Sequence, residues 1–253
     1  MDAKLDQPKL DQHYVDPRLV ALYDTNNPSG PDTDFYLRLA DGLGAQRILD
    51  LGCGTGLLTR QLATQERDVT GIDPAPAMLA WAKAQPGAGR VEWREGDSRV
   101  LGTLEADLAL MTGNVAQVFL EDEQWADTLR DLHAALRGGG VLAFESRNPA
   151  ARDWEQWNRE ATNEQISTPD SPLECWLDVV RVEGGRVRFL AHNVFGATGE
   201  DIVVESELRF RSRDELVESL TEAGFAAPQV YGDWQNGPMN PESRIMVFVA
   251  HRL

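Results

Sequence analysis

Short apolar runs alternate with amphipathic stretches along residues 45–150. The apolar runs have the length of buried strands, and the stretches between them repeat apolar residues at helical spacing. Strands are predicted at 47–52, 68–73, 90–97, 106–113 and 138–146, and helices at 56–66, 75–85 and 122–136. Because strands that alternate with helices are joined by right-handed crossovers, this pattern predicts a parallel sheet.

The pattern changes after residue 146. Three β-rich runs, separated by glycine-containing segments, predict an antiparallel meander over 174–210. About 65 residues separate the fifth strand from the next helix, at 212–224, although a crossover needs only about a dozen. We therefore expect a small antiparallel insert outside the main sheet. One side of it is expected to carry Val180, Val182, Val187, Phe189 and Ala191.

The two ends of the chain complete the expected architecture. Asp16-Pro17 predicts the start of a helix over 17–23, since Asp is a preferred N-cap and Pro suits the first helical position. A second helix, with Phe35, Leu39 and Ala40 on one face, ends near Gly44, and two last strands lie at 228–233 and 244–252. The expected domains are an N-terminal helical lid (1–44), a core (45–149 and 211–253) and the insert (150–210).

Three glycines follow the first strand at alternate positions. Gly52, Gly54 and Gly56 lie between an apolar run and a helix, although glycine weakens both kinds of element. In an open α/β sheet the first strand–helix turn is a prime ligand position, and it can equally be only a tight turn. A dinucleotide site needs G-x-G-x-x-G, but the third glycine would fall on Leu57. That mismatch disfavours a dinucleotide oxidoreductase.

Composition narrows the range of partners. The chain has 253 residues, a net charge of −17 and a pI near 4.6, and nucleic-acid binders usually carry a basic surface. No run of 18 apolar residues predicts a membrane span, and the polar start of the chain does not predict a secretory leader. We expect a cytoplasmic protein that binds neither nucleic acid nor membranes.

Cysteine and histidine spacing adds two expectations. Only Cys53 and Cys175 are present, which gives no disulfide framework and suits a reducing compartment. No metal-ligand spacing relates these cysteines to the histidines, so no metal site is expected. The four histidines are His13, His133, His192 and His251.

The segment "LDLGCGTG" resembles the first motif of class I S-adenosylmethionine-dependent methyltransferases, acidic-x-Gly-x-Gly-x-Gly after the first strand. The resemblance covers about 40–150 and the final strand pair. It implies a Rossmann-like seven-stranded, mostly parallel sheet with an antiparallel last strand, and S-adenosylmethionine as cofactor, with S-adenosylhomocysteine as product. The residues that it places at the cofactor are Asp50, Gly52, Cys53, Gly54, Gly56, Asp73, Pro74, Met78, Asp97, Ser98, Met111 and Thr112.

The resemblance also implies individual roles at successive strand ends. Asp73 would accept the ribose hydroxyls, and Asp97 with the backbone of Ser98 would bind the adenine. Residues 111–114 would lie beside the methionine part and the reactive methyl. Two of these positions have ordinary structural alternatives, because Asp73 before a proline can cap a helix and Asp97 can form a turn.

The methyl acceptor is less clear from the sequence. Methyl transfer relies mainly on orientation and removal of water, so no single catalytic residue is required. His192, Glu145 and Arg147 are candidates. Three segments are expected to reach the methyl group: the N-terminal lid with Tyr14 and Tyr23, the segment 147–176 with Trp154, Trp157 and Trp176, and the loop 232–243.

The expected function is methyl transfer to nitrogen or oxygen of a small organic molecule by a monomer or homodimer. The insert follows the fifth strand, as it does in small-molecule methyltransferases that include amino-sugar and glycine N-methyltransferases. One alternative is a module that binds the cofactor without turnover. An RNA or protein methyltransferase is less favoured, because of the charge and because "TGNV" stands where an Asn-Pro-Pro-aromatic motif would fall.

Overall fold

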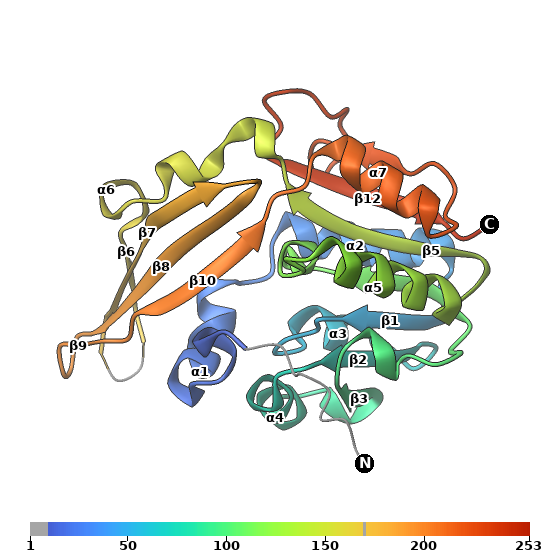
Figure 1. Cartoon of the computed structure of the whole chain (residues 1–253). Coiled ribbons are helices and arrows are strands. Elements are labelled where there is room, and N and C mark those ends of the chain that lie inside the picture. The colour runs from blue at the N-terminus through green and yellow to red at the C-terminus, as the bar shows by residue number, and fades with distance from the viewer. Residues whose placement is uncertain (1–9, 169–170) are drawn as a thin grey trace, which may run out of the picture.

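Seven strands form the main sheet in a computed structural model that describes residues 10–168 and 171–253 (Figure 1). In spatial order they are β11 (Gln229–Tyr231), β12 (Ile245–His251), β5 (Leu136–Arg147), β4 (Ala106–Met111), β1 (Arg47–Leu51), β2 (Asp68–Asp73) and β3 (Val91–Glu95). Only β12 runs against the others, pairing antiparallel with both β5 and β11. The predicted Rossmann-like sheet with an antiparallel last strand is confirmed.

Helices cover both faces of this sheet. On one face, α5 (Asp122–Ala135) and α7 (Arg213–Glu222) bury Trp125, Leu129 and Leu216 against β1, β5 and β12. On the other face, α2 (Pro31–Leu43) and α3 (Leu57–Leu62) pack Phe35 and Leu62 on β1, β4 and β12. The remaining helix of the core is α4 (Pro76–Ala84), and the short 3-10 turns used below are η3 (Ser98–Val100) and η4 (Val115–Gln117). No helix in the described part of the chain is long and apolar enough to cross a membrane.

Two element boundaries differ from the expected ones. Strand β5 begins at Leu136, so the three glycines 138–140 lie inside its first half rather than in a preceding turn. Helix α3 ends at Leu62 instead of continuing to residue 66. Both differences lie at the ends of elements, where residue propensities define the boundary least well.

The expected antiparallel insert is present as a second sheet (Figure 1). Its order is β10 (Val204–Arg209), β8 (Arg186–Phe195), β7 (Leu173–Glu183) and β6 (Glu164–Ile166), with β9 (Glu200–Asp201) pairing to β8 and the short helix α6 (Arg159–Thr162) preceding β6. The prediction for Val180 is wrong. A bulge between Val179 and Arg181 shifts the register there, and Val180 is 54% exposed whereas Val187 is fully buried. Val182 pairs with Val187 but is exposed at the end of the hairpin.

The N-terminal segment bridges the two sheets. The turn η1 (Gln12–Tyr14) and helix α1 (Pro17–Asn26) lie between the second sheet and α4 (Figure 1). As predicted, α1 begins at Pro17, and the Asp16 carboxylate accepts the Arg18 N–H. Arg18 also pairs with Glu200 of β9 at 2.8 Å. The expected lid (1–44) and insert (150–210) include residues 1–9 and 169–170, which lie outside the described residues; their domain boundaries stay a prediction.

Candidate active site

The glycine-rich loop after β1 leaves open space above Gly54. The backbone of Gly52 and Gly56 has positive φ (77° and 70°), and a Cβ would come within 2.5 Å of Val115 and 2.3 Å of Trp93, respectively. Gly54 also has a positive φ of 54°, but no atom lies within 4 Å of where its Cβ would be. Packing therefore explains the outer two glycines, whereas the middle one faces free space in which a ligand can lie against the backbone.

Asp50, on β1, carries a buried acceptor atom without a partner. Its Oδ2 accepts the Thr59 hydroxyl at 2.6 Å, and its Oδ1 is buried with no hydrogen-bond partner among the described residues. Burial raises the pKa of this carboxyl to about 6, and the negative charge of Asp73 adds to the shift. An unsatisfied carboxylate oxygen in the interior is costly, so this position favours a cationic or hydrogen-bond-donating ligand.

Asp73 ends β2 and fixes two backbone groups. Its Oδ2 accepts the Gly54 N–H at 2.8 Å and its Oδ1 accepts the Ala75 N–H at 2.8 Å. Burial raises the pKa of Asp73, and these two hydrogen bonds oppose the shift. The helix-capping interpretation is wrong, because the N-cap of α4 is Ala75 and Asp73 instead forms a turn just before the helix. Its carboxylate also ties the glycine-rich loop to the start of α4, where Pro74 precedes the buried Met78.

Asp97 and Ser98 follow β3 and engage protein partners. Asp97 caps η3 by accepting the Arg99 N–H at 3.0 Å, and it also pairs with the Arg99 guanidinium, which lowers the pKa of Asp97. The Ser98 hydroxyl donates to Asp131 of α5 at 2.6 Å. The turn-forming role of Asp97 is observed, and contact of Asp97 and Ser98 with adenine stays a prediction.

The carboxylate of Glu145, on β5, accepts hydrogen bonds from α2 and from the segment that follows β4. The Tyr36 hydroxyl of α2 and the Asn114 backbone N–H both donate to its carboxylate, and burial raises the pKa of Glu145 to about 7. Two predicted cofactor residues precede Asn114 at the end of β4. Met111 is fully buried in the core, whereas Thr112 is half-buried. The Oδ1 of Asn114 is buried with no partner among the described residues.

Arg147 lies two residues further along β5, on the same side of the strand as Glu145. Its guanidinium donates to Gln117 Oε1 at 2.9 Å and lies 5.6 Å from the ring centre of Trp157. No carboxylate of the described residues lies within 4 Å of it (the ion pairs involve other arginines), and burial lowers the pKa of Arg147. Two of the three catalytic candidates thus share one edge of the site, as a carboxyl group and a guanidinium without a direct counter-ion.

The N-terminal segment, with η1 and α1, brings two tyrosines to the same edge. The rings of Tyr14 and Tyr23 lie 6.2 Å apart. Burial and the charge of Asp73 raise the pKa of both phenols, that of Tyr23 to about 12. A pocket of about 170 Å³ adjoins these rings and ends on Asn193 of β8. His13, Leu19, Asn26 and Asn27 complete its lining.

The structure does not bring His192 to this edge. Its Nδ1 lies 2.7 Å from Asp201 Oδ2, and its ring stacks on Trp176 at 4.3 Å. Because side chains alternate across a strand, Asn193 faces the pocket while His192 and Trp176 point to the opposite face of the second sheet. Trp157 does face the core, packing on Phe189 at 4.9 Å. The other expected aromatic residue, Trp154, packs on Phe210.

The sequence did not single out Tyr36 or Gln117. Tyr36 lies next to Phe35 in the predicted second helix, and helical spacing marks only the apolar face of that helix. Asn114 belongs to residues 111–114, which were expected beside the methionine part of the cofactor, but no individual role was predicted for it. Its backbone N–H, rather than its side chain, reaches Glu145, and no sequence pattern reports that.

The chemistry of the site fits S-adenosylmethionine. Asp50, Asp73 and Glu145 place three buried carboxyl groups at neighbouring strand ends, and the ligand carries an ammonium group, a sulfonium and a ribose diol. Carboxylates accept hydroxyl and ammonium hydrogen bonds, and a nearby cation lowers the cost of their burial. No cluster of three or more metal-ligating side chains was found in the described part of the chain.

Comparison with known proteins gives the same assignment. Residues 48–140 match the family described as a methyltransferase domain. A protein of Geobacillus sp. (strain WCH70), assigned by name to the methyltransferases, is 26% identical over 215 residues, which are 83% of this chain and 85% of that protein. The chain spans about half the length, or less, of the next curated relatives, which are named for their substrates.

Two solved structures share the fold over almost the whole chain. The CcbJ methyltransferase from Streptomyces caelestis matches with a TM-score of 0.77 at 20% identity, covering 92% of this chain and 96% of that one. The sugar N-methyltransferase KedS8 from Streptoalloteichus sp. ATCC 53650 matches with a TM-score of 0.73 at 18% identity, covering 100% of this chain and 98% of that one. The domain match over residues 48–140 and the strand-end residues agree with an S-adenosylmethionine-dependent methyltransferase that uses S-adenosylmethionine as its cofactor, and the two solved structures show the same fold.

Proposed function

We propose that the protein transfers a methyl group to a nitrogen or oxygen atom of a small polar molecule that also carries an anionic group. The observation that carries the proposal is the pair Glu145 and Arg147. One is a buried carboxyl group whose pKa is raised to about 7, and the other is a guanidinium with no carboxylate of the described residues within 4 Å. The first suits proton transfer near neutral pH, and the second suits a carboxylate or phosphate of the acceptor.

S-adenosylmethionine, when bound, would supply an activated methyl group, whose bond to sulfur breaks as the acceptor's nitrogen or oxygen bonds to the methyl carbon and S-adenosylhomocysteine leaves. Arg147 then orients the acceptor, with Gln117 fixing the guanidinium and Trp157 lying against it. Glu145 accepts the proton that an amine or hydroxyl loses, and the Asn114 N–H helps to hold the carboxylate in place. Tyr14 and Tyr23 exclude water from this edge. Orientation of this kind is worth about 7–11 kcal/mol in favourable cases.

Two observations support a small acceptor over a macromolecule. The net charge of −17 opposes binding of a nucleic-acid backbone. KedS8, which matches over the whole chain, is named a sugar N-methyltransferase. The amine acceptor is favoured over the hydroxyl because an amine must lose its proton before transfer, and Glu145 titrates in the right range. A monomer or homodimer in the cytoplasm is part of the proposal.

The test is a panel of matched acceptors with methyl-labelled S-adenosylmethionine. Each compound is supplied as an amine or a hydroxyl, and with or without a carboxylate. We expect label in small amines that carry an anionic group, with transfer lost in Arg147→Gln and retained in Arg152→Gln, whose exposed side chain pairs with Glu155. Transfer that is equally fast for neutral acceptors, or that is unaffected by Arg147→Gln, would overturn the assignment of the anionic group.

A further inference from the structure

The loop from β4 to α5 contacts the two acceptor-side residues at its beginning. We call residues 112–121 the β4–α5 loop. The Asn114 N–H donates to Glu145, and Gln117 Oε1 accepts from Arg147 at 2.9 Å. Val115 packs where a Cβ on Gly52 would lie. The geometry of the β4–α5 loop therefore sets the position of Glu145 and Arg147 and touches the glycine-rich loop.

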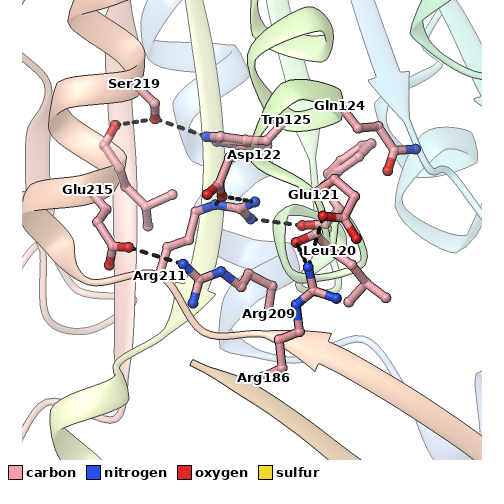
Figure 2. Close-up of polar contacts among 12 residues, drawn as sticks. Leu120, Glu121, Asp122, Gln124, Trp125, Arg186, Arg209, Arg211, Glu215 and Ser219 are labelled. Atoms are coloured by element: carbon pink, nitrogen blue, oxygen red, sulfur yellow. Dashed lines mark hydrogen bonds and ion pairs between the residues drawn. The ribbon is translucent and has the colours of Figure 1, made fainter. Parts of the chain in front are cut away.

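Two arginines from the region of the second sheet donate hydrogen bonds to the end of the same loop (Figure 2). Arg186, the first residue of β8, donates to the Leu120 carbonyl at 3.2 Å and to Glu121 at 2.9 Å. Arg211, which follows β10, donates to the Phe119 carbonyl at 2.9 Å and to Asp122 at 2.9 Å. These contacts join backbone carbonyls of the β4–α5 loop to the strands that cover the acceptor side.

Arg211 is unusually buried for a charged group. Its side chain is only 4% exposed, it lies 5.5 Å from the ring centre of Trp125, and burial lowers its pKa. Hydrogen bonds from a charged donor to buried carbonyls are among the stronger ones in proteins. Figure 2 shows Arg209 beside it, bound to Glu215 of α7 at 3.2 Å. The link between loop and second sheet therefore combines the buried guanidinium of Arg211, bound to the Phe119 carbonyl, with a more exposed pair between Arg186 and Glu121.

We propose that Arg186 and Arg211 are positioning residues, which lock the β4–α5 loop to the second sheet so that Asn114 and Gln117 hold Glu145 and Arg147 in their reactive arrangement. The two arginines do not reach the substrate and act through the loop. The proposal rests on the proposed function for the roles of Glu145 and Arg147. Its physical basis is that Ala116, Gln117 and Phe119 are buried, so that the arginine contacts at residues 119–122 act on a loop that is packed as one unit up to Gln117.

The test measures hydrogen exchange of the Asn114 amide in the full chain saturated with S-adenosylhomocysteine. Arg186→Gln is the probe, because Arg186 is partly exposed whereas Arg211→Gln leaves a buried carbonyl unpaired and can fail to fold. Arg188→Gln is the matched control, since Arg188 lies on the same strand and pairs with Glu205. We expect exchange at Asn114 to rise about tenfold in Arg186→Gln. It should stay within about twofold of the parent in Arg188→Gln and in the conservative variant Arg186→Lys.

The location of the change decides the outcome. A role confined to anchoring the second sheet would speed exchange only at residues 119–122, and an unchanged Asn114 amide overturns the proposal. This readout requires no methyl acceptor, so it stands or falls separately from the acceptor panel. With an acceptor from that panel, Arg186→Gln should lower kcat/KM for the acceptor about tenfold while the affinity for S-adenosylhomocysteine is retained. An equal loss in kcat/KM and in the affinity for S-adenosylhomocysteine would also overturn the proposal.

Discussion

The Thr55 hydroxyl donates a hydrogen bond to the Asp24 carboxylate, which ties helix α1 directly to the glycine-rich loop. Thr55 is almost fully buried between Gly54 and Gly56, and Arg60 of α3 approaches the same carboxylate at 3.9 Å. The Nη1 atom of Arg60 is buried without a partner among the described residues. Helix α1 and the glycine-rich loop are therefore linked through the Asp24 carboxylate, and we expect a change in one to alter the position of the other.

Thr55→Val should weaken cofactor binding through the lid. The substitution keeps the shape of the side chain but removes the donor to Asp24, and hydrogen bonds to charged groups contribute about 1.5–3 kcal/mol. We expect S-adenosylhomocysteine to bind about tenfold more weakly by calorimetry. Thr221→Val is the control, because the Thr221 hydroxyl donates only to the Val217 carbonyl of its own helix. Equal affinities of the two variants for S-adenosylhomocysteine would show that the Thr55–Asp24 hydrogen bond does not contribute to ligand binding.

Two substitutions of Asp73 should separate its support of the backbone from ligand binding. Asp73→Ala removes both backbone hydrogen bonds, whereas Asp73→Asn can still accept from Ala75. Loss of a hydrogen bond costs about 1 kcal/mol of folding stability, so only the alanine variant should melt clearly lower. Both variants should bind S-adenosylhomocysteine about 1.5–3 kcal/mol more weakly, because both lack the carboxylate.

Melting temperature and calorimetry on the two proteins give the answer. Parent-like affinity in a folded Asp73→Asn protein would restrict Asp73 to holding the Gly54 and Ala75 backbone.

The strand ends were predictable because periodicity and chain order determine them. Apolar runs and helical spacing place Asp50, Asp73 and Asn114 at the carboxyl ends of successive parallel strands, and all parallel strands end at one edge. The contacts within the site were not predictable in this way. Tyr36 reaches Glu145 across 109 positions of sequence, and only the packing of α2 on the sheet brings them together.

Single-residue alternation explains the positions of His192 and Val180 in the insert. His192 and Asn193 are neighbours in the sequence but lie on opposite faces of β8, and the sequence pattern does not say which face meets the core. Val180 is exposed because a bulge interrupts the alternation between Val179 and Arg181. A bulge of this kind has no marker in a run of β-branched residues.

His192→Gln should leave methyl transfer almost unchanged. The ring lies against Trp176 and Asp201 on the face of β8 away from Arg147. We expect kcat/KM within about twofold of the parent, since surface substitutions distant from a site have small effects. Steady-state kinetics with an acceptor from the panel provides the measurement. A loss comparable to that of Glu145→Gln, in a protein with normal melting behaviour, would return His192 to the list of catalytic candidates.

Glu145→Gln should remove a pH dependence from both activity and stability. The folded-state pKa of about 7 lies above the ordinary carboxyl value of 4.5, so the folded protein holds a proton that the unfolded chain releases. Between about pH 4.5 and 7 this group therefore makes the parent less stable as the pH rises, by up to about 3 kcal/mol in all. Deprotonation through the same range should increase the transfer rate, because the carboxylate is the proposed proton acceptor.

Denaturant titrations and kcat/KM profiles from pH 5 to 8 test both statements (roughly the range in which this carboxyl titrates). The glutamine variant should show a flatter stability curve and lose the rise in rate, whereas Glu155→Gln, an exposed control paired with Arg152, should follow the parent. Bound S-adenosylmethionine should shift the parent's transition to lower pH, because a nearby cation favours the ionised carboxyl. A parent-like rise in rate for Glu145→Gln would move the proton-accepting role to another group.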